Sequence, residues 1–187
     1  GFLEIETFSA IRSLLSGAPG TFLILDMGAS ATNVSIVENG VVYRSHVINR
    51  GSQDITIALS RSLGVSILHA EEMKRDHGLL DDTDGENTVA ATARLIMEEV
   101  FAEVNRVLLE YEKKQHKAVD KVFLLGGGAL LKGVLLLAKK NLETEVLLGD
   151  PFAKVETPAF LDALLKEIGP SFSVALGVAL RRLQEVE

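Results

Sequence analysis

The sequence predicts an α/β fold built on one mixed sheet, in which an antiparallel three-stranded meander is flanked by helices. Three observations support this prediction. Residues 21–48 contain three β-rich runs separated by turn-forming residues, residues 52–116 follow a mainly helical pattern, and strands alternate with helices from residue 121 onward. Hairpins followed by strand–helix alternation are typical of a mixed sheet covered by helices.

The predicted meander begins with residues 21–25, which read TFLIL and form an apolar run that ends at Asp26. Such a run is typical of a strand that is buried on both faces. The second strand alternates over residues 32–37, and an Asn-Gly pair then favours a tight hairpin, because both residue types tolerate positive φ. The third strand covers residues 41–48.

The predicted helices follow the 3.6-residue apolar period and stop at helix-ending residues. Gly64 ends one helix and Ser66 caps the next. The longest helix carries Val100 and Tyr111 among its apolar positions, and an acidic loop over residues 79–87 precedes it. The expected helices cover residues 6–17, 52–63, 67–77, 88–116, 130–141, 159–168 and 171–185, and two further strands cover 121–125 and 145–148.

Composition narrows the class of protein. Apolar residues make up 47% of the 187 residues, which is ample for a buried core. The formal net charge of -7 disfavours non-specific binding to nucleic acid or anionic membranes, and the lack of cysteine excludes disulfides and thiolate zinc sites. No apolar run is expected to reach the length of a membrane span, and the start lacks the pattern of a signal peptide. Because the chain starts with Gly1, we expect further residues upstream in the parent protein.

A first candidate site follows the buried strand that ends at Asp26. A buried carboxylate is costly unless it is paired, hydrated or coupled to a metal. The small residues that follow let backbone N–H groups approach an anion, and Ser30 and Thr32 add hydroxyl donors. The pattern fits a phosphate cradle with a carboxylate that organises Mg²⁺. An ordinary tight hairpin with a turn-capping aspartate is the alternative.

A second candidate site is the apolar strand VFLL, which runs directly into Gly126-Gly127-Gly128. Three successive glycines cost backbone entropy, and a generic strand–helix turn needs one at most. The run therefore indicates that something flat or bulky packs on bare backbone. A loose strand–helix turn without a ligand is the alternative.

Other phosphate and metal motifs do not match. The pair Lys132-Gly133 has the wrong order for a P-loop, and Leu131 stands where a dinucleotide fingerprint needs glycine. The acidic loop lacks ligands at the first and last positions of a calcium loop. The four histidines are too scattered for a paired ligand set, so we expect surface or structural roles for them. A nucleophile-elbow sequence is also absent.

The two candidate motifs, one on a hairpin and one on a strand–helix turn, together resemble the actin, heat-shock chaperone and sugar-kinase superfamily. Within it, the sequence resembles the PilM-type actin-like ATPases of type IV pilus assembly. Their second phosphate loop resembles the segment LDMGASATNVSIVENGVV. The helices that follow this loop resemble RGSQDITIALSRSLGVSILHAEEMK, and their adenosine motif resembles VFLLGGGALLKGV. The resemblance runs from about residue 20 to 184 and implies an actin-like (ribonuclease H-like) ATPase fold that binds ATP and Mg²⁺.

Position by position, the resemblance implies a set of site residues. Asp26 would organise Mg²⁺ through water. On the longest helix, Glu103 and Arg106 match the position that faces the ribose and base, although an ordinary exposed pair at i,i+3 spacing is the alternative. The implied phosphate-binding residues are Gly28, Ala29, Ser30, Ala31 and Thr32. The implied adenosine-binding residues are Gly126, Gly127, Gly128, Glu103 and Arg106.

The resemblance concerns the second, C-terminal domain of such proteins. It implies that residues 18–50 and 118–187 form a core nucleotide-binding subdomain and that about 51–117 form a helical insertion. The sequence departs from the superfamily at Ala29 and Ala31, where many members carry glycine. A complete member has a first domain with its own phosphate loop. We therefore expect at most weak ATPase activity in the full-length protein and an inactive isolated chain, because catalysis needs phosphates clamped from both sides.

The expected function is an ATP-binding scaffold for type IV pilus assembly. The resemblance implies a cytoplasmic protein held at the inner membrane by PilN-like assembly proteins that dock on the first domain. It also allows self-association, without nucleic-acid binding or direct membrane insertion. The main alternative is an FtsA-like cell-division protein, which polymerises and tethers the division ring to the membrane through a basic amphipathic helix, whereas this chain ends RRLQEVE. A sugar or acetate kinase and a domain without nucleotide are further alternatives.

Overall fold

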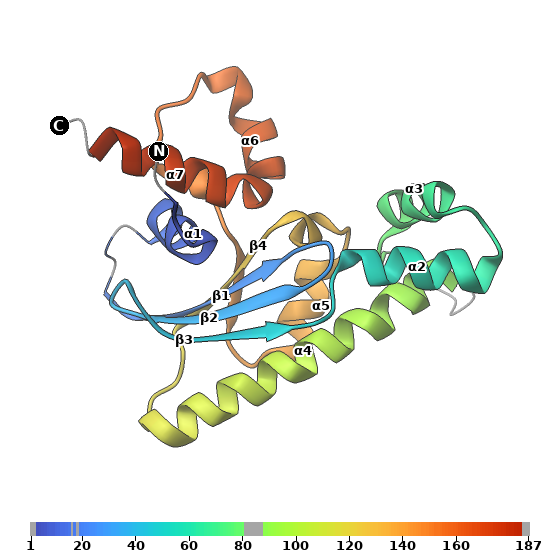
Figure 1. The fold of residues 1–187 in the computed structure, drawn as a ribbon, viewed down its shortest axis with the longest axis horizontal. Helices are drawn as coiled ribbons and strands as arrows, with labels where there is room; N and C mark the ends of the chain where they lie inside the picture. Colours follow the sequence, from blue (N-terminus) through green and yellow to red (C-terminus); the bar gives the residue numbers. More distant parts are fainter. Residues whose placement is uncertain (1–2, 16, 18, 81–87, 185–187) are drawn as a thin grey trace.

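The computed structural model describes residues 3–15, 17, 19–80 and 88–184. Its centre is a five-stranded mixed sheet (Figure 1). The strands are β1 (Thr21–Met27), β2 (Thr32–Glu38), β3 (Val41–Ile48), β4 (Lys121–Leu125) and β5 (Glu145–Leu148). Their order is β3-β2-β1-β4-β5, with β1 to β3 antiparallel and β4 and β5 parallel to β1. The predicted mixed sheet with its three-stranded meander is therefore confirmed.

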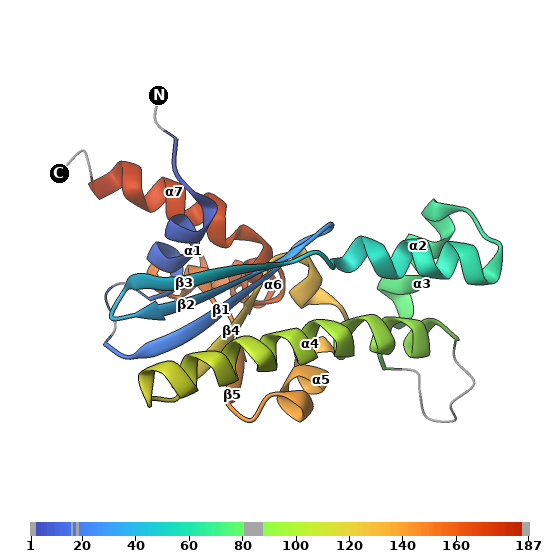
Figure 2. The same cartoon turned by 60° about the horizontal axis from the view of Figure 1, so that its bottom comes forward.

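Helices cover both faces of this sheet (Figure 2). α1 and α7 lie together on one face, whereas α4 and α5 lie on the other. The α-helices are α1 (Glu6–Leu14), α2 (Ser52–Leu63), α3 (Ile67–His77), α4 (Thr88–Gln115), α5 (Val134–Asn141), α6 (Asp162–Ile168) and α7 (Ser173–Gln184). Short 3₁₀ turns are η1 (Gly127–Leu130), η2 (Pro151–Lys154), η3 (Ala159–Leu161) and η4 (Gly169–Phe172).

The alternation of side chains along β1 builds both layers of the core. Leu23 and Leu25 join the cluster that includes α4 and α5, and Phe22 and Ile24 join the smaller cluster under α1. Asp26 continues the second set, because successive strand residues point to opposite faces. Its carboxylate therefore lies at the end of the strand, on the face that carries α1.

Several element boundaries differ from the predicted ones. β1 runs two residues beyond the predicted strand, so Asp26 lies within the strand and not after it. The helix predicted over 130–141 begins only at Val134, because Gly133 has a φ of 83° and the preceding residues form η1. The helices predicted over 159–168 and 171–185 are likewise preceded by the 3₁₀ turns η3 and η4. The helix predicted over 6–17 ends earlier, at Leu14. The acidic loop lies largely outside the described residues.

One described stretch, Ala159–Leu183, is long and apolar enough to span a membrane by length and composition. The expectation that no apolar run reaches this length was therefore wrong. In the structure the stretch contains two helices, α6 and α7, which run in different directions on either side of η4 (Figure 1). Pro170 lies between them and cannot continue a regular helix. By itself, the match in length and composition is weak evidence for a membrane segment.

The three helices α2, α3 and α4 extend beyond one end of the sheet (Figure 1). α4 belongs to both parts of the molecule, because Ala93 and Tyr111, near its opposite ends, join one continuous hydrophobic cluster. Tyr111 also donates a hydrogen bond of 2.5 Å to Glu38 on β2. The division into a core subdomain and an insertion over about 51–117 stays a prediction.

Candidate functional site

The hairpin between β1 and β2 has a rigid, small-residue tip. The Gly28 N–H donates to the Ala31 carbonyl over 2.9 Å, and Ala29 and Ser30 are exposed. The carbonyls of Gly28 and Ala29 accept hydrogen bonds of 3.0 and 2.8 Å from the first two N–H groups of α2. The tip is thus fixed against the start of α2, and its exposed backbone is available to a ligand.

Thr32 has a different role from the one predicted. Its side chain is fully buried, and its hydroxyl donates a hydrogen bond of 2.9 Å to the carbonyl of Arg50. The hydroxyl is therefore committed to the connection between β3 and α2, so the expected contribution of this hydroxyl to phosphate binding is corrected. Ser30 remains the exposed hydroxyl of the hairpin tip.

Asp26 and the glycine turn meet at the end of the sheet. β1 and β4 are parallel neighbours, and their register places Asp26 opposite Leu125, the residue before the turn. A Cβ at Gly126 would lie 2.5 Å from Asp26 Oδ1, so bare backbone adjoins the carboxylate. Burial raises the pKa of Asp26, and the nearby negative charge of Glu6 raises it further. The two motifs, distant in sequence, are therefore adjacent in the structure.

The three glycines of this turn have different reasons to be glycine. Gly126 has a φ of 81°, and its N–H donates to the Pro170 carbonyl over 2.9 Å. Gly128 is buried, and a Cβ there would lie 2.8 Å from the Cβ of Met27. Gly127 is exposed and has open space around its missing side chain. The fold alone explains Gly126 and Gly128, so only Gly127 is left for a ligand to explain.

A cavity of about 450 Å³ lies beside the glycine turn. Its walls come from the start of α2, from α3, from the glycine turn and the residues after it, and from the end of α6. The lining residues are Ser52, Glu71, Lys74, Arg75, Gly127, Gly128, Leu130, Leu131, Lys132 and Glu167. The cavity therefore combines two leucines and bare backbone with several charged groups, so its lining suits a polar, charged ligand better than an apolar one.

Lys74 is the buried charged group of this cavity, with 6% of its surface exposed. Its Nζ donates to Glu71 over 2.7 Å, to the Thr56 hydroxyl over 3.0 Å and to the Ser52 carbonyl over 3.1 Å. Burial would raise the pKa of Glu71, but hydrogen bonds from Lys74, Thr56 and Arg75 outweigh it and lower the pKa to about 2. Glu71 and Lys74 thus form a charged pair of fixed geometry.

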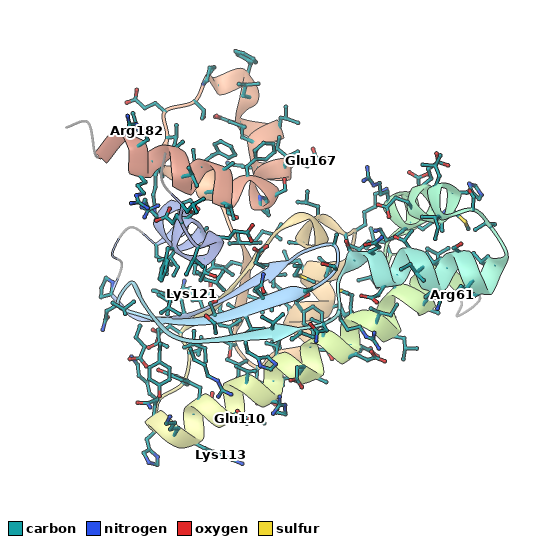
Figure 3. All side chains as sticks on the ribbon, in the orientation of Figure 1. Arg61, Glu110, Lys113, Lys121, Glu167 and Arg182 are labelled. Carbon is teal, nitrogen blue, oxygen red and sulfur yellow. The ribbon has the colours of Figure 1, made fainter. Side chains whose placement is uncertain are left out.

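Glu103 and Arg106, predicted to face adenosine, lie elsewhere. Glu103 pairs with His46 on β3 over 2.9 Å, and Arg106 binds both Glu103 and Glu110. Neither residue lines the cavity beside the glycine turn. In Figure 3, Glu110 lies near the C-terminal end of α4, far from Glu167 at the end of α6. The structure therefore supports the alternative interpretation of an ordinary surface pair, which also holds α4 against β3.

The sequence reasoning missed Glu71, Lys74 and Arg75. All three lie in α3, and Glu71 and Lys74 belong to the stretch that resembles the PilM-type helices, although the resemblance implied no role for them. The i,i+3 spacing of Glu71 and Lys74 was a usable signal, because it places both side chains on one helix face. It could not be distinguished from a surface ion pair without knowing that α3 faces the glycine turn.

Solved structures of similar fold define the class of this domain. The chain is 28% identical to a chain of the PilM-PilN type IV pilus biogenesis complex, with a TM-score of 0.82 over 96% of this chain and 52% of that one. An archaeal actin homolog in complex with ADP shows the same fold, with a TM-score of 0.68 and 18% identity over 96% of this chain and 57% of that one. The domain is therefore actin-like and similar to PilM, as the sequence predicted.

Sequence comparison then identifies the family. The family model for the cell division protein FtsA matches residues 23–177, so the chain belongs to the FtsA family of actin-like proteins. FtsA of Agrobacterium fabrum is 25% identical, covering 83% of this chain and 39% of the relative. FtsA of Streptococcus pneumoniae is also 25% identical, covering 83% and 38%. The chain thus spans less than half the length of these curated relatives.

Proposed function

We propose that this chain forms one wall of the ATP-binding cleft of a PilM-like actin-like protein that scaffolds type IV pilus assembly. The observation that carries the proposal is the contact between the Asp26 carboxylate and Gly126 beside the charged cavity. The match to an actin homolog in complex with ADP, and to a Clostridium difficile dehydratase activator with bound ADPNP, supports a nucleotide as the ligand class.

The nucleotide phosphates would lie over the exposed backbone of the hairpin tip, at Ala29 and Ser30. Adenosine would enter the cavity and pass over Gly127. The ribose hydroxyls would then donate hydrogen bonds to Glu71, whose orientation Lys74 fixes through its 2.7 Å hydrogen bond. We infer this placement of the phosphates and the ribose from Ser52, which links the hairpin to α3. The Ser52 carbonyl accepts a hydrogen bond from Lys74, and the Ser52 N–H donates one to the Gly28 carbonyl of the hairpin.

Mg²⁺ fits this arrangement through Asp26. The described residues contain no group of three or more potential metal-binding side chains, so a cage made only of protein ligands is not present there. Mg²⁺ commonly keeps several waters and uses one carboxylate together with substrate phosphates. Asp26, whose burial disfavours an uncompensated charge, is the residue that would hold such an ion, directly or through water. The metal would neutralise phosphate charge when it is bound.

The pilus function rests on the likeness to PilM, and cell division is the second candidate because the FtsA family model matches most of the chain. In the pilus case, the protein is cytoplasmic and held at the inner membrane by PilN-like partners that dock outside this chain. The solved PilM-PilN complex supports such a partner. In the division case, the protein would polymerise and carry an amphipathic membrane helix.

The nucleotide site is tested by titrating Mg-ATP into the full-length protein that contains this chain, using isothermal calorimetry. We expect saturable binding that Asp26→Ala weakens at least about tenfold in Mg²⁺ and much less in EDTA, because the variant removes the metal-organising carboxylate. Glu98→Ala, an exposed position of α4 that does not line the cavity, serves as the control. Absence of binding by the wild type at millimolar Mg-ATP would refute the proposal.

The choice between pilus assembly and division needs a separate test. The full-length protein is mixed with anionic vesicles and, separately, with a PilN-like cytoplasmic peptide, and co-sedimentation and fluorescence anisotropy are measured. Peptide binding without vesicle binding supports the pilus scaffold. Vesicle binding through an amphipathic helix that follows residue 187, without peptide binding, supports the division protein instead.

A further inference from the structure

The outward face of α4 carries a stripe of exposed apolar residues. Leu95 is 62% exposed, Leu109 is 55% exposed, and Ala102 lies exposed midway between them. Val104 and Tyr111, on the opposite side of the helix, are buried in the core. Single exposed leucines are ordinary, but a spacing of seven residues is typical of a helix that packs lengthwise against another helix. Within the described residues, this stripe stays open to solvent.

A groove between α4 and α5 runs beside the stripe (Figure 2). Its first hollow, of about 220 Å³, lies along the N-terminal half of α4 and is lined by the exposed Leu136 and by two basic residues, Arg94 and Lys140. Its second hollow, of about 310 Å³, lies along the C-terminal half of α4 and is lined by Glu112 and Glu143. The groove therefore has a basic end and an acidic end.

The other flank of the stripe, toward β3, carries charges in the reverse order. Glu99, in the N-terminal half of α4, pairs with Arg50 over 3.2 Å. Arg106, in the C-terminal half, pairs with Glu103 and Glu110. Both Glu99 and Arg106 remain exposed, so each can face a further charged group. Each flank of the stripe is thus positive at one end and negative at the other.

Such a surface is complementary to a copy of itself. In an antiparallel pair of helices, residues at equal distances on either side of a two-fold axis lie next to each other. An axis beside Ala102 would place Leu95 of one copy against Leu109 of the other. It would also place Glu99 near Arg106 of the second copy, and the basic end of each groove beside the acidic end of the other. The helix macrodipoles favour the same antiparallel direction.

We propose that the outward face of α4 is a two-fold contact between two copies of this protein, antiparallel and centred on Ala102. The sequence resemblance allowed self-association but gave no surface for it. The stripe lies outside the cavity beside the glycine turn, so this inference does not rest on the proposed ATP site. A contact made mainly by one helix face lies at the small end of protein interfaces, so the dimer is weak and depends on concentration.

Sedimentation velocity of the full-length protein without nucleotide, from low micromolar to submillimolar concentrations, tests the contact. We expect the wild type to shift from monomer to dimer over this range. Ala102→Glu should raise the Kd of the dimer at least about tenfold, because it brings two like charges together at the axis. Leu109→Ala should also weaken the dimer, whereas Leu68→Ala, at a 71% exposed leucine of α3, should leave it unchanged.

Oxidative cross-linking tests the antiparallel direction. A disulfide forms only when the two Cα atoms are within about 7 Å of each other. In the proposed dimer, the two copies of position 95 lie about 21 Å apart along the helix axis, since they are separated by fourteen helical steps. Leu95→Cys alone should therefore give no more cross-linked dimer than the unsubstituted protein, whereas a mixture of Leu95→Cys and Leu109→Cys should cross-link.

Three results would overturn the proposal. The first is a wild type that stays monomeric at submillimolar concentration. The second is an association that Ala102→Glu leaves as tight as in the wild type, or that Leu68→Ala weakens equally. The third is a cross-link of Leu95→Cys with itself, which requires parallel helices. Circular dichroism confirms that each variant is folded, which we expect because all the substituted side chains are exposed.

Discussion

Asp26 and Gly126 lie so close together that only glycine fits at position 126. A Cβ at position 126 would lie 2.5 Å from the carboxylate and 2.6 Å from the Met27 carbonyl, so every other residue type would push β1 and β4 apart. The surroundings of Lys74 are equally closely fitted, because its ammonium group has three hydrogen-bond acceptors within 3.1 Å. A buried charge is tolerated when it is paired and hydrogen-bonded, so this network stabilises an otherwise costly group.

At the residue scale, Glu71 should make stability depend on pH. Its pKa is about 2 in the folded protein against an ordinary value of 4.5, so its stabilising contribution is present above 4.5 and is lost as the pH falls toward 2. We expect Glu71→Gln to lower the free energy of unfolding by about 2 kcal/mol at pH 7, because it leaves Lys74 buried without its carboxylate. The difference from the wild type should vanish near pH 2.

Urea unfolding followed by circular dichroism from pH 7 to pH 2 measures this effect, with Glu98→Gln as an exposed control. A difference between Glu71→Gln and the wild type that stays constant over the whole pH range would contradict the assigned network.

At the element scale, the turn between β4 and η1 combines a structural and a binding role. The turn continues directly from a strand of the core, and η4 holds it through the Pro170 carbonyl. Both Gly127 and Gly128 line the cavity, but Gly128 packs against Met27, whereas Gly127 has open space around its missing side chain. The two neighbouring glycines therefore differ in the room available for an added methyl group, which makes them a matched pair for substitution.

We expect Gly128→Ala to lower the free energy of unfolding by about 2 kcal/mol, because its methyl group would overlap Met27. Gly127→Ala should change stability by less than about 0.5 kcal/mol, since no atom lies within 4 Å of the added group. The same variant should weaken ATP binding severalfold by filling part of the cavity. Thermal unfolding and calorimetric titration test both; equal effects of the two variants on stability would be inconsistent with this assignment.

At the scale of the whole molecule, the site is assembled from elements that are remote in sequence. The hairpin follows β1, the charged pair comes from α3, the glycine turn follows β4, and the last turn of α6 completes the cavity wall. Parallel pairing of β1 with β4 and the link from Pro170 to Gly126 bring them together. Because the chain covers 52% of the PilM chain it resembles, the activity of the complete protein remains a proposal.

Hydrogen exchange of the full-length protein should map this assembly. With Mg-ATP, we expect slower exchange in the hairpin, α3 and the glycine turn, because the proposed nucleotide would lie against these three segments. The stretch of α4 around Glu103 and Arg106 should not change, since that pair lies against β3 and outside the cavity. Protection at Glu103 with none in α3 would instead favour the adenosine site expected from sequence resemblance.

The sequence indicated the mixed sheet because strand and helix periodicities are local properties of the chain. Boundaries were less well predicted where 3₁₀ turns replace the first turn of a helix, as η1 does before Val134. The hairpin and glycine turn were recognised as motifs, but the reasons for Gly126 and Gly128 were not visible, because both depend on contacts with β1. Thr32 was misassigned because its hydroxyl partner, Arg50, belongs to another element.

By itself, the sequence determined the class of fold, the two candidate turns and the resemblance to actin-like proteins. Short, local patterns of apolar, small and charged residues indicate those features. Only the tertiary structure showed which charged residues lie beside the glycine turn: Glu71 and Lys74 line the cavity there, whereas Glu103 pairs with His46 elsewhere. The physical reason is that the strand order and the packing of the helices determine which helix faces lie against each other. The local apolar periodicity of a sequence shows which face of a helix is buried, but not which other element covers it.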